Sequence, residues 1–152
     1  MDCDYVAHII RDVFPQRTFT TLYGRSKELL DVLHMPKHGI GAFMMHTERG
    51  KYLSNDECKY WEAGINDTYF GESICDLFIS FNYDPELLND DTDMVARQIK
   101  SFLKPGGFAM VVNPGVWAND LGKYLTINAQ VETEIKRYSM FKNENVLVYE
   151  NI

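Results

Sequence analysis

The sequence predicts an α/β fold in which helices flank a mostly parallel sheet and an antiparallel hairpin is added at the C-terminal end. Segments of strand length alternate with segments of helical periodicity through most of the 152 residues. Residues 40–46, 75–81 and 108–112 are predominantly apolar, which is typical of strands covered on both faces. Two further segments with strand character follow one another near the end, and they predict the hairpin.

Length and composition indicate one domain over residues 1–152. Apolar residues make up 45% of the chain and charged residues 24%, near the averages for globular proteins. A domain of this size buries about 70% of its unfolded surface and needs no disulfide. No apolar run of about 18 residues occurs, and no basic segment precedes an apolar one at the N-terminus, so we expect neither a membrane span nor a secretory signal.

The net charge limits the binding partners that we expect, and the cysteine content limits the cellular compartment. Fifteen basic minus 22 acidic residues leave a net charge of −7, which disfavours nucleic-acid binding. The cysteines Cys3, Cys58 and Cys75 are far apart and form no C-x-x-C pair, which favours free thiols in a reducing compartment. We therefore expect a cytoplasmic protein that does not associate with membranes.

The first half of the chain predicts two helices and two strands. An apolar stripe of helical spacing ends before Pro15, and its members are Val6, Ile9, Ile10 and Val13. The β-branched segment 18–22 predicts a strand, a helix is expected over 26–33, and the apolar segment 40–46 predicts the second strand.

The middle of the chain predicts a helix and two strands. Ser54 and Glu57 form a capping box, in which each side chain satisfies a free backbone N–H, so a short helix is expected from there to about Ala63. A weak strand is expected over 68–70 and a strong one over 75–81.

A helix is then expected from about residue 91, because acidic side chains gather where they complement the helix dipole. Its apolar face consists of Val95, Ile99, Phe102 and Leu103. The segment 104–107, Lys-Pro-Gly-Gly, favours a type II turn with Gly106 at positive φ. After the strand 108–112, a short helical stretch is expected over 117–125. The alternating segment 131–138 and the segment 146–149 predict the hairpin.

The stretch from Glu72 to Pro114 resembles class I S-adenosylmethionine-dependent methyltransferases. The resemblance rests on a Ser-Ile-Cys-Asp-Leu-Phe-Ile-Ser strand over 73–80, a helix, the turn Leu-Lys-Pro-Gly-Gly over 103–107 and an apolar strand, in the family's order. It implies a Rossmann-like sheet and S-adenosylmethionine as cofactor. The family's glycine-rich loop after the first strand is represented by Tyr23-Gly24-Arg25, which keeps one glycine.

The resemblance also implies positions for the cofactor. Tyr23 and Gly24 lie in the degenerate loop, and Glu48 follows the second strand, where a carboxylate accepts both ribose hydroxyls. A solvated glutamate in a loop is the alternative for Glu48. Asp67, or Asn66, is nearest to the adenine position, with a turn role as the alternative.

The remaining candidate site residues follow the predicted strand 75–81, which corresponds to the fourth strand of the family. Asn82 is expected beside the cofactor, and Tyr83 and Asp84 beside the acceptor, because ligands bind outside the carboxyl ends of parallel strands. An Asp-Pro turn into the next helix is the alternative reading of this segment.

Two functions from different classes remain open. The chain is a small methyltransferase acting on an unidentified acceptor, or a non-catalytic methyltransferase-like module that has lost cofactor binding and binds a protein partner. No metal-binding His spacing, G-x-S-x-G nucleophile motif or Walker motif occurs. The bulky Tyr23 and Arg25 favour the second function, since glycines let the backbone approach a cofactor closely.

Overall fold

The computed structural model describes residues 3–14, 19–23, 42–46, 52–54, 58–62, 72–73, 75–82, 85 and 91–152. The predicted helix over 26–33 and the weak strand over 68–70 lie outside these residues. No helix in the described segments is long and apolar enough to cross a bilayer.

A five-stranded sheet forms the centre of the described structure, with β1 (Phe19–Tyr23), β5 (Cys75–Phe81), β6 (Leu103–Val112), β8 (Val146–Glu150) and β7 (Thr126–Ile127) in that order. The first three strands are parallel to one another, whereas β8 is antiparallel to both of its neighbours. This arrangement confirms the predicted α/β class, with a mostly parallel centre and an antiparallel addition.

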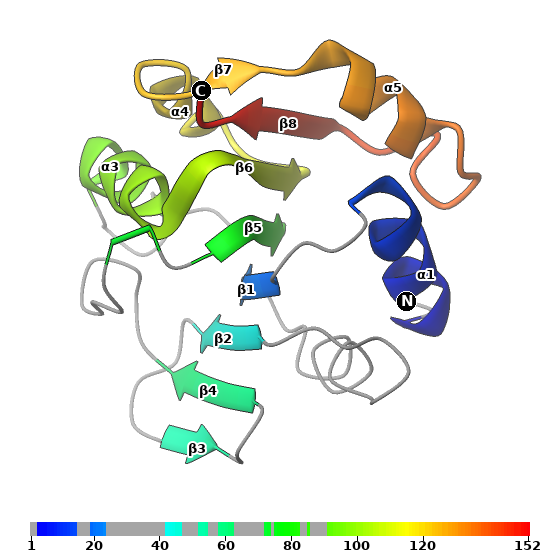
Figure 1. Ribbon diagram of the computed structural model, residues 1–152. Coiled ribbons are helices and arrows are strands. Elements are labelled where there is room, and N and C mark those ends of the chain that lie inside the picture. The colour runs from blue at the N-terminus through cyan, green and yellow to red at the C-terminus, as the bar shows by residue number, and fades with distance from the viewer. Residues whose placement is uncertain are drawn as a thin grey trace.

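A second group of strands continues from the free side of β1 (Figure 1). It consists of β2 (Ala42–His46), β4 (Cys58–Glu62) and β3 (Tyr52–Ser54). β2 and β4 are parallel and β3 is antiparallel to β4.

Helices cover both faces of the central sheet (Figure 1). α1 (Cys3–Val13) and α5 (Ala129–Lys136) pack on one face, and α3 (Thr92–Phe102) and α4 (Ala118–Leu121) on the other. Alternate residues of β5 enter the two cores: Leu77 and Ile79 face α1 and α5, and Phe78 faces α3. This two-sided burial is the physical reason that β5 is apolar along most of its length.

α3 begins where the acidic residues predict it. The carboxylate of Asp91 accepts hydrogen bonds from the backbone N–H groups of Asp93 at 3.0 Å and Met94 at 3.3 Å, which satisfies two free donors of the first turn. Gly106 has φ +80°, as predicted. The segment 104–107 is a kink within β6 rather than a turn before it, because β6 already pairs with β5 at Leu103.

Two predicted elements are wrong. The capping-box segment 54–63 is not a helix, since β3 ends at Ser54 and Cys58–Glu62 forms β4. Residues 58–62 pair with β2 on one side and β3 on the other. Pairing with distant strands satisfies the same backbone groups that a local cap would satisfy, and it overrides the local signal.

The predicted hairpin strand 131–138 is the helix α5 instead. Val131 and Ile135 are spaced four residues apart, so their alternation also suits a helical face, and Ile135 is fully buried. The Asn128 side chain caps this helix by accepting from the Val131 N–H at 3.1 Å. β8 therefore pairs with β7, on the N-terminal side of α5, and the predicted helix over 117–125 is limited to the four residues of α4.

Candidate functional site

The carboxyl edge of the sheet between β1 and β5 is the candidate site. From β1 the chain leads to β2 on one side, whereas β5 and β6 extend the sheet on the other (Figure 1). Such a reversal of strand order leaves a crevice outside the carboxyl ends, where ligands bind in open α/β sheets. Tyr23, the last residue of β1, is in register with Ser80 of β5. Asn82 therefore follows β5 at this reversal.

Two asparagines turn the chain at the ends of the two central strands. Asn82 follows β5 with φ 53°, and Asn113 follows β6 with φ 50°. Asparagine tolerates this left-handed conformation better than most residues. The backbone N–H of Asn82 donates to the Val112 carbonyl at 2.9 Å, so the two turns are held at the same height of the sheet.

A hydrogen-bonded cluster joins these turns to the segment before β8. Asn113 Nδ2 donates to Asn82 Oδ1 at 3.3 Å and to Glu144 Oε2 at 2.5 Å. The backbone N–H of Asn145 donates to Asn113 Oδ1 at 3.0 Å, and the Asn113 N–H donates to the Asn145 carbonyl at 2.7 Å. Asn82 and Asn113 are exposed and Glu144 is half-buried, so the cluster lies at the protein surface.

Sequence reasoning missed Asn113 and Glu144. An Asn-Pro pair directly after an apolar strand was the available signal for Asn113, because it repeats the placement of Asn82. No local pattern marks Glu144, whose position depends on the antiparallel pairing of β6 with β8.

Of the predicted site residues, Tyr23 and Asn82 lie within the described structure. Tyr23 is placed by its backbone at the end of β1, and Asn82 is placed with its side chain. Gly24, Glu48, Asp67, Tyr83 and Asp84 lie outside the described residues, as do Asn66 and Arg25. Their roles stay predictions.

The described residues at this edge supply hydrogen-bonding groups. Within the described segments, no three His, Cys, Asp or Glu side chains are grouped so that they could hold a metal ion. The side-chain amide of Asn82 supplies two N–H donors, and Glu144 supplies carboxylate oxygens. This set suits a polar ligand that carries acceptor atoms.

A polar network fixes the start of α3, which follows the candidate site in the chain. The Tyr124 hydroxyl donates to Asp93 Oδ1 at 2.6 Å and holds the pKa of that carboxyl below its usual value. Thr92 Oγ1 donates to Asp120 Oδ2 at 2.5 Å, and this bond is the main cause that lowers the pKa of Asp120. The network therefore keeps both carboxylates charged and ties α3 to the α4 segment.

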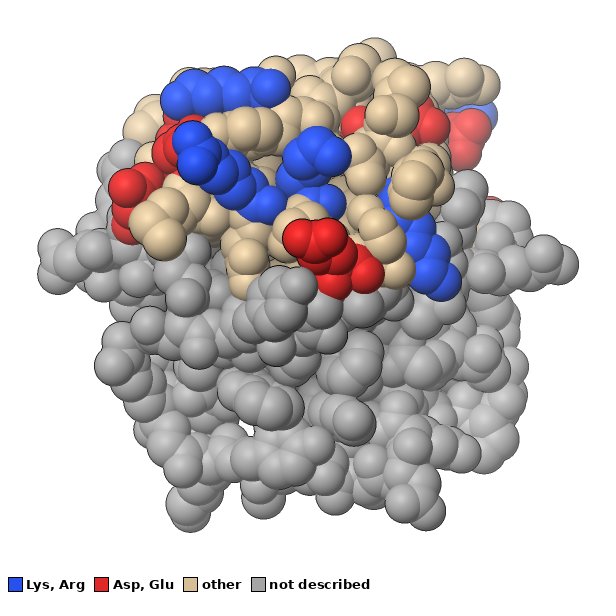
Figure 2. Space-filling view, turned by 60° about the vertical axis from the view of Figure 1, so that its left-hand side comes forward, with Lys and Arg blue, Asp and Glu red and all other residues tan. Residues whose placement is uncertain are grey.

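Two of the cations near α3 and α4 are paired with acids. Figure 2 shows Lys and Arg side chains gathered on the described part of one face, with acidic side chains among them. Arg97 lies 3.0 Å from Asp93, and Lys123 lies 3.0 Å from Asp120. These pairs give the described part of this face a mixed charge.

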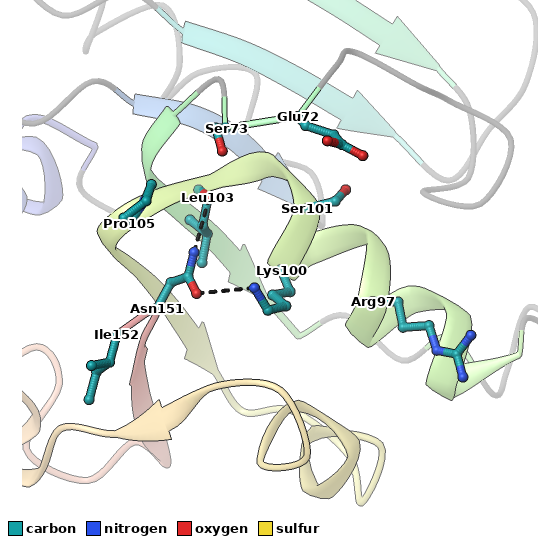
Figure 3. Close-up of a pocket in the computed structure, with 9 residues that line it drawn as sticks. All are labelled: Glu72, Ser73, Arg97, Lys100, Ser101, Leu103, Pro105, Asn151 and Ile152. Atoms are coloured by element: carbon teal, nitrogen blue, oxygen red, sulfur yellow. Dashed lines mark hydrogen bonds between the residues drawn. The ribbon is translucent and has the colours of Figure 1, made fainter.

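A hollow of about 380 Å³ lies at the opposite, amino edge of the sheet (Figure 3). Glu72 and Ser73 precede β5 there, and Lys100 Nζ donates to Asn151 Oδ1 at 3.4 Å. Asn151 Nδ2 donates in turn to the Leu103 carbonyl at 3.1 Å. These contacts join the segment after β8 to the start of β6, so Asn151 has a structural role in this hollow.

Comparison with known proteins supports the fold. The sequence matches no protein-family model and no curated protein. Among solved structures, it resembles a TehB-like SAM-dependent methyltransferase from Corynebacterium glutamicum, with a TM-score of 0.64 and 13% identity over 96% of this chain and 86% of that one.

Two further structures resemble the chain. One is from the complex of a putative methyltransferase with the Trm112 methyltransferase activator of Haloferax volcanii, with a TM-score of 0.64 and 13% identity over 99% of this chain and 97% of that one. The other is geranyl diphosphate C-methyltransferase from Streptomyces coelicolor, solved with S-adenosyl-L-homocysteine, with a TM-score of 0.61 and 9% identity over 97% and 77% of the two chains. The chain thus has a divergent class I methyltransferase-like fold, as predicted.

Proposed function

We propose that the chain binds S-adenosylmethionine at the carboxyl edge between β1 and β5 and transfers its methyl group to an acceptor. The observation that carries the proposal is the register of Tyr23 with Ser80. It places the end of β1 beside the end of β5, which Asn82 follows, at the reversal of strand order, where ligands of such sheets bind. The similarity to SAM-dependent enzymes of this fold supports the choice of ligand.

Among the described residues, Asn82 has a side chain that suits such a ligand. Asn82 is exposed and its amide supplies N–H donors, which suit carboxylate, hydroxyl and ring-nitrogen acceptors. We assign Tyr23 and Gly24 to the loop beside the cofactor, Glu48 to its ribose hydroxyls and Asp67 to its adenine. Tyr83 and Asp84 are assigned to the acceptor.

When bound, the cofactor supplies an electrophilic methyl group on a sulfonium. Because displacement is in line, the protein mainly has to hold the acceptor near attack distance and exclude water. The part assigned to Asn82 is orientation of the cofactor by hydrogen bonding. The acceptor stays unidentified, and the mixed charge around α3 favours a partner other than nucleic acid.

The alternative is a non-catalytic module. It is supported by Tyr23 and Arg25, which replace the small residues of the glycine-rich loop. In this case the chain binds a protein partner. The similar structure from Haloferax volcanii is a complex with the Trm112 activator, which supports a protein partner.

Titration with S-adenosylmethionine and S-adenosyl-L-homocysteine, followed by calorimetry and thermal melting, separates the two functions. Ligand at about 100 times its dissociation constant should stabilise the chain by about 2.7 kcal/mol. A chain that shows no heat of binding and no shift in melting temperature with either ligand at millimolar concentration has no cofactor site, and the alternative then stands.

A further inference from the structure

The direction of the Asn82 amide is set by a chain of hydrogen bonds that starts at the protein backbone. A backbone N–H only donates, so the Asn145 N–H at 3.0 Å identifies the facing atom of Asn113 as its oxygen. The amide nitrogen of Asn113 must then point to the other side. There it meets Glu144 Oε2, a carboxylate oxygen that only accepts.

The same nitrogen determines how Asn82 is turned. Asn113 Nδ2 donates to Asn82 at 3.3 Å, so Asn82 presents its oxygen to Asn113. Its own Nδ2 therefore lies on the other side of the planar amide group. In the part of the chain that the structure describes, no residue accepts a hydrogen bond from this nitrogen. The two N–H donors of this nitrogen therefore have no acceptor among the described residues.

We propose that Asn113 is a positioning residue, which turns the Asn82 amide so that its N–H donors face the bound cofactor. The inference rests on the proposed function, because it takes Asn82 to contact S-adenosylmethionine. It goes further than that function because it names what orients the Asn82 N–H groups. These are Asn113, in the turn after β6, together with Glu144 and the Asn145 backbone.

A charge-neutral exchange tests this role. In the double variant Asn113→Asp with Glu144→Gln, one negative charge moves from position 144 to position 113. The introduced carboxylate accepts from the Asn145 N–H and from the amide introduced at position 144, so the bonds that hold the loops together persist. This carboxylate also requires a donor from Asn82, which turns that amide round and presents its oxygen to the ligand.

The probe is S-adenosyl-L-homocysteine, measured by calorimetry beside a thermal melt. We expect the exchange variant to melt close to wild type and to bind the probe at least about tenfold more weakly, the change for loss of a hydrogen bond to a charged group. Asn82→Ala should weaken binding similarly in the wild-type chain and add no further loss in the exchange variant.

A matched control introduces a negative charge beside the cluster and leaves the side chains of Asn82, Asn113 and Glu144 unchanged. Asn145 contributes its backbone to the cluster, so Asn145→Asp should bind the probe as wild type does. If the Asn113 exchange variant does not fold, Asn82→Asp tests the same point. It keeps an oxygen toward Asn113 and removes the ligand-facing donors, and it should lose at least about tenfold in affinity.

The outcomes separate this inference from the function on which it rests. A wild-type chain that does not bind the probe overturns both. If wild type binds and the folded exchange variant binds equally well, the positioning role is overturned while the cofactor site stands. Equal binding by Asn82→Asp would likewise remove Asn82 as a donor to the ligand.

Discussion

The buried side chain of Asn151 donates a hydrogen bond to the main-chain carbonyl of Leu103 at 3.1 Å, and thereby joins the end of β8 to the beginning of β6. The same amide donates to the Lys104 carbonyl at 3.3 Å. The main chain adds two bonds, from the Gly106 N–H to the Asn151 carbonyl at 2.6 Å and from the Asn151 N–H to the Gly107 carbonyl at 2.8 Å. The kink of β6 is therefore held by a residue from the far end of the chain.

Asn151→Ala should lower the free energy of unfolding by about 1–3 kcal/mol, because it leaves buried carbonyl groups without a donor. Asn151→Asp should cost more at neutral pH, since it directs a carboxylate at those carbonyls. Urea denaturation measures both. Asn143→Ala, at an exposed position, is the control and should change the free energy of unfolding by less than about 0.5 kcal/mol.

Gly106→Val should destabilise the chain by about 1 kcal/mol or more. A built Cβ meets no atom within 4 Å, so the cost comes from φ +80° alone, which strains a β-branched residue. Gly106→Asn should cost less, because asparagine tolerates a left-handed backbone. Equal thermal stability of wild type and the valine variant would contradict this explanation of the kink.

Tyr124→Phe should raise the pKa of Asp93 towards its usual value, because the variant removes the hydroxyl that stabilises the carboxylate. A carboxyl whose pKa is lowered in the folded state stabilises the protein above its unfolded pKa, and this contribution is lost as pH falls through the folded pKa. The variant should therefore be less stable than wild type at neutral pH, and this difference in the free energy of unfolding should disappear in acid.

A carboxyl titration by NMR reports the pKa of Asp93 directly. Tyr138→Phe is the matched control, since its hydroxyl lies 3.4 Å from Asp12 and touches a different helix. An unchanged Asp93 titration in Tyr124→Phe would show that another contact lowers this pKa.

Glu48→Ala should weaken S-adenosylmethionine binding by about 1.5–3 kcal/mol, the range for hydrogen bonds to a charged group. The melting temperature without ligand should change little, because the role proposed for Glu48 is in ligand binding. Glu72→Ala removes an exposed carboxylate at the opposite edge of the sheet and should leave affinity unchanged. Equal affinity of Glu48→Ala and wild type would take Glu48 out of the site.

The double variant Tyr23→Gly with Arg25→Gly should gain cofactor affinity if bulk in this loop obstructs the ligand. It should also lose roughly 0.5–1 kcal/mol of stability per site, because glycine raises the entropy of the unfolded chain. Loss of binding that wild type clearly has would instead show that Tyr23 and Arg25 hold the ligand, by stacking and by bidentate hydrogen bonding. Calorimetry of wild type and the double variant shows whether the affinity for the cofactor rises or falls.

The two sequence errors have a common cause. Residues 58–62 follow a local signal for a helix and form a strand, whereas residues 129–136 overlap a segment that alternates as a strand does and form a helix, so the local signal is overridden in both. Contacts with residues distant in the sequence decide whether each segment forms a helix or a strand. Ala42–His46 pairs with the first segment, and the other core residues bury Ile135 of the second.

The sequence by itself determined the class of the fold, the strand β5, the start of α3 and the conformation of Gly106. These depend on periodicity, capping and backbone sterics, which act within a few residues. Only the tertiary structure decided that Asn82, Asn113 and Glu144 form one cluster. Their proximity follows from the pairing of β5 with β6 and of β6 with β8, which joins residues distant in the chain, so no local pattern encodes it.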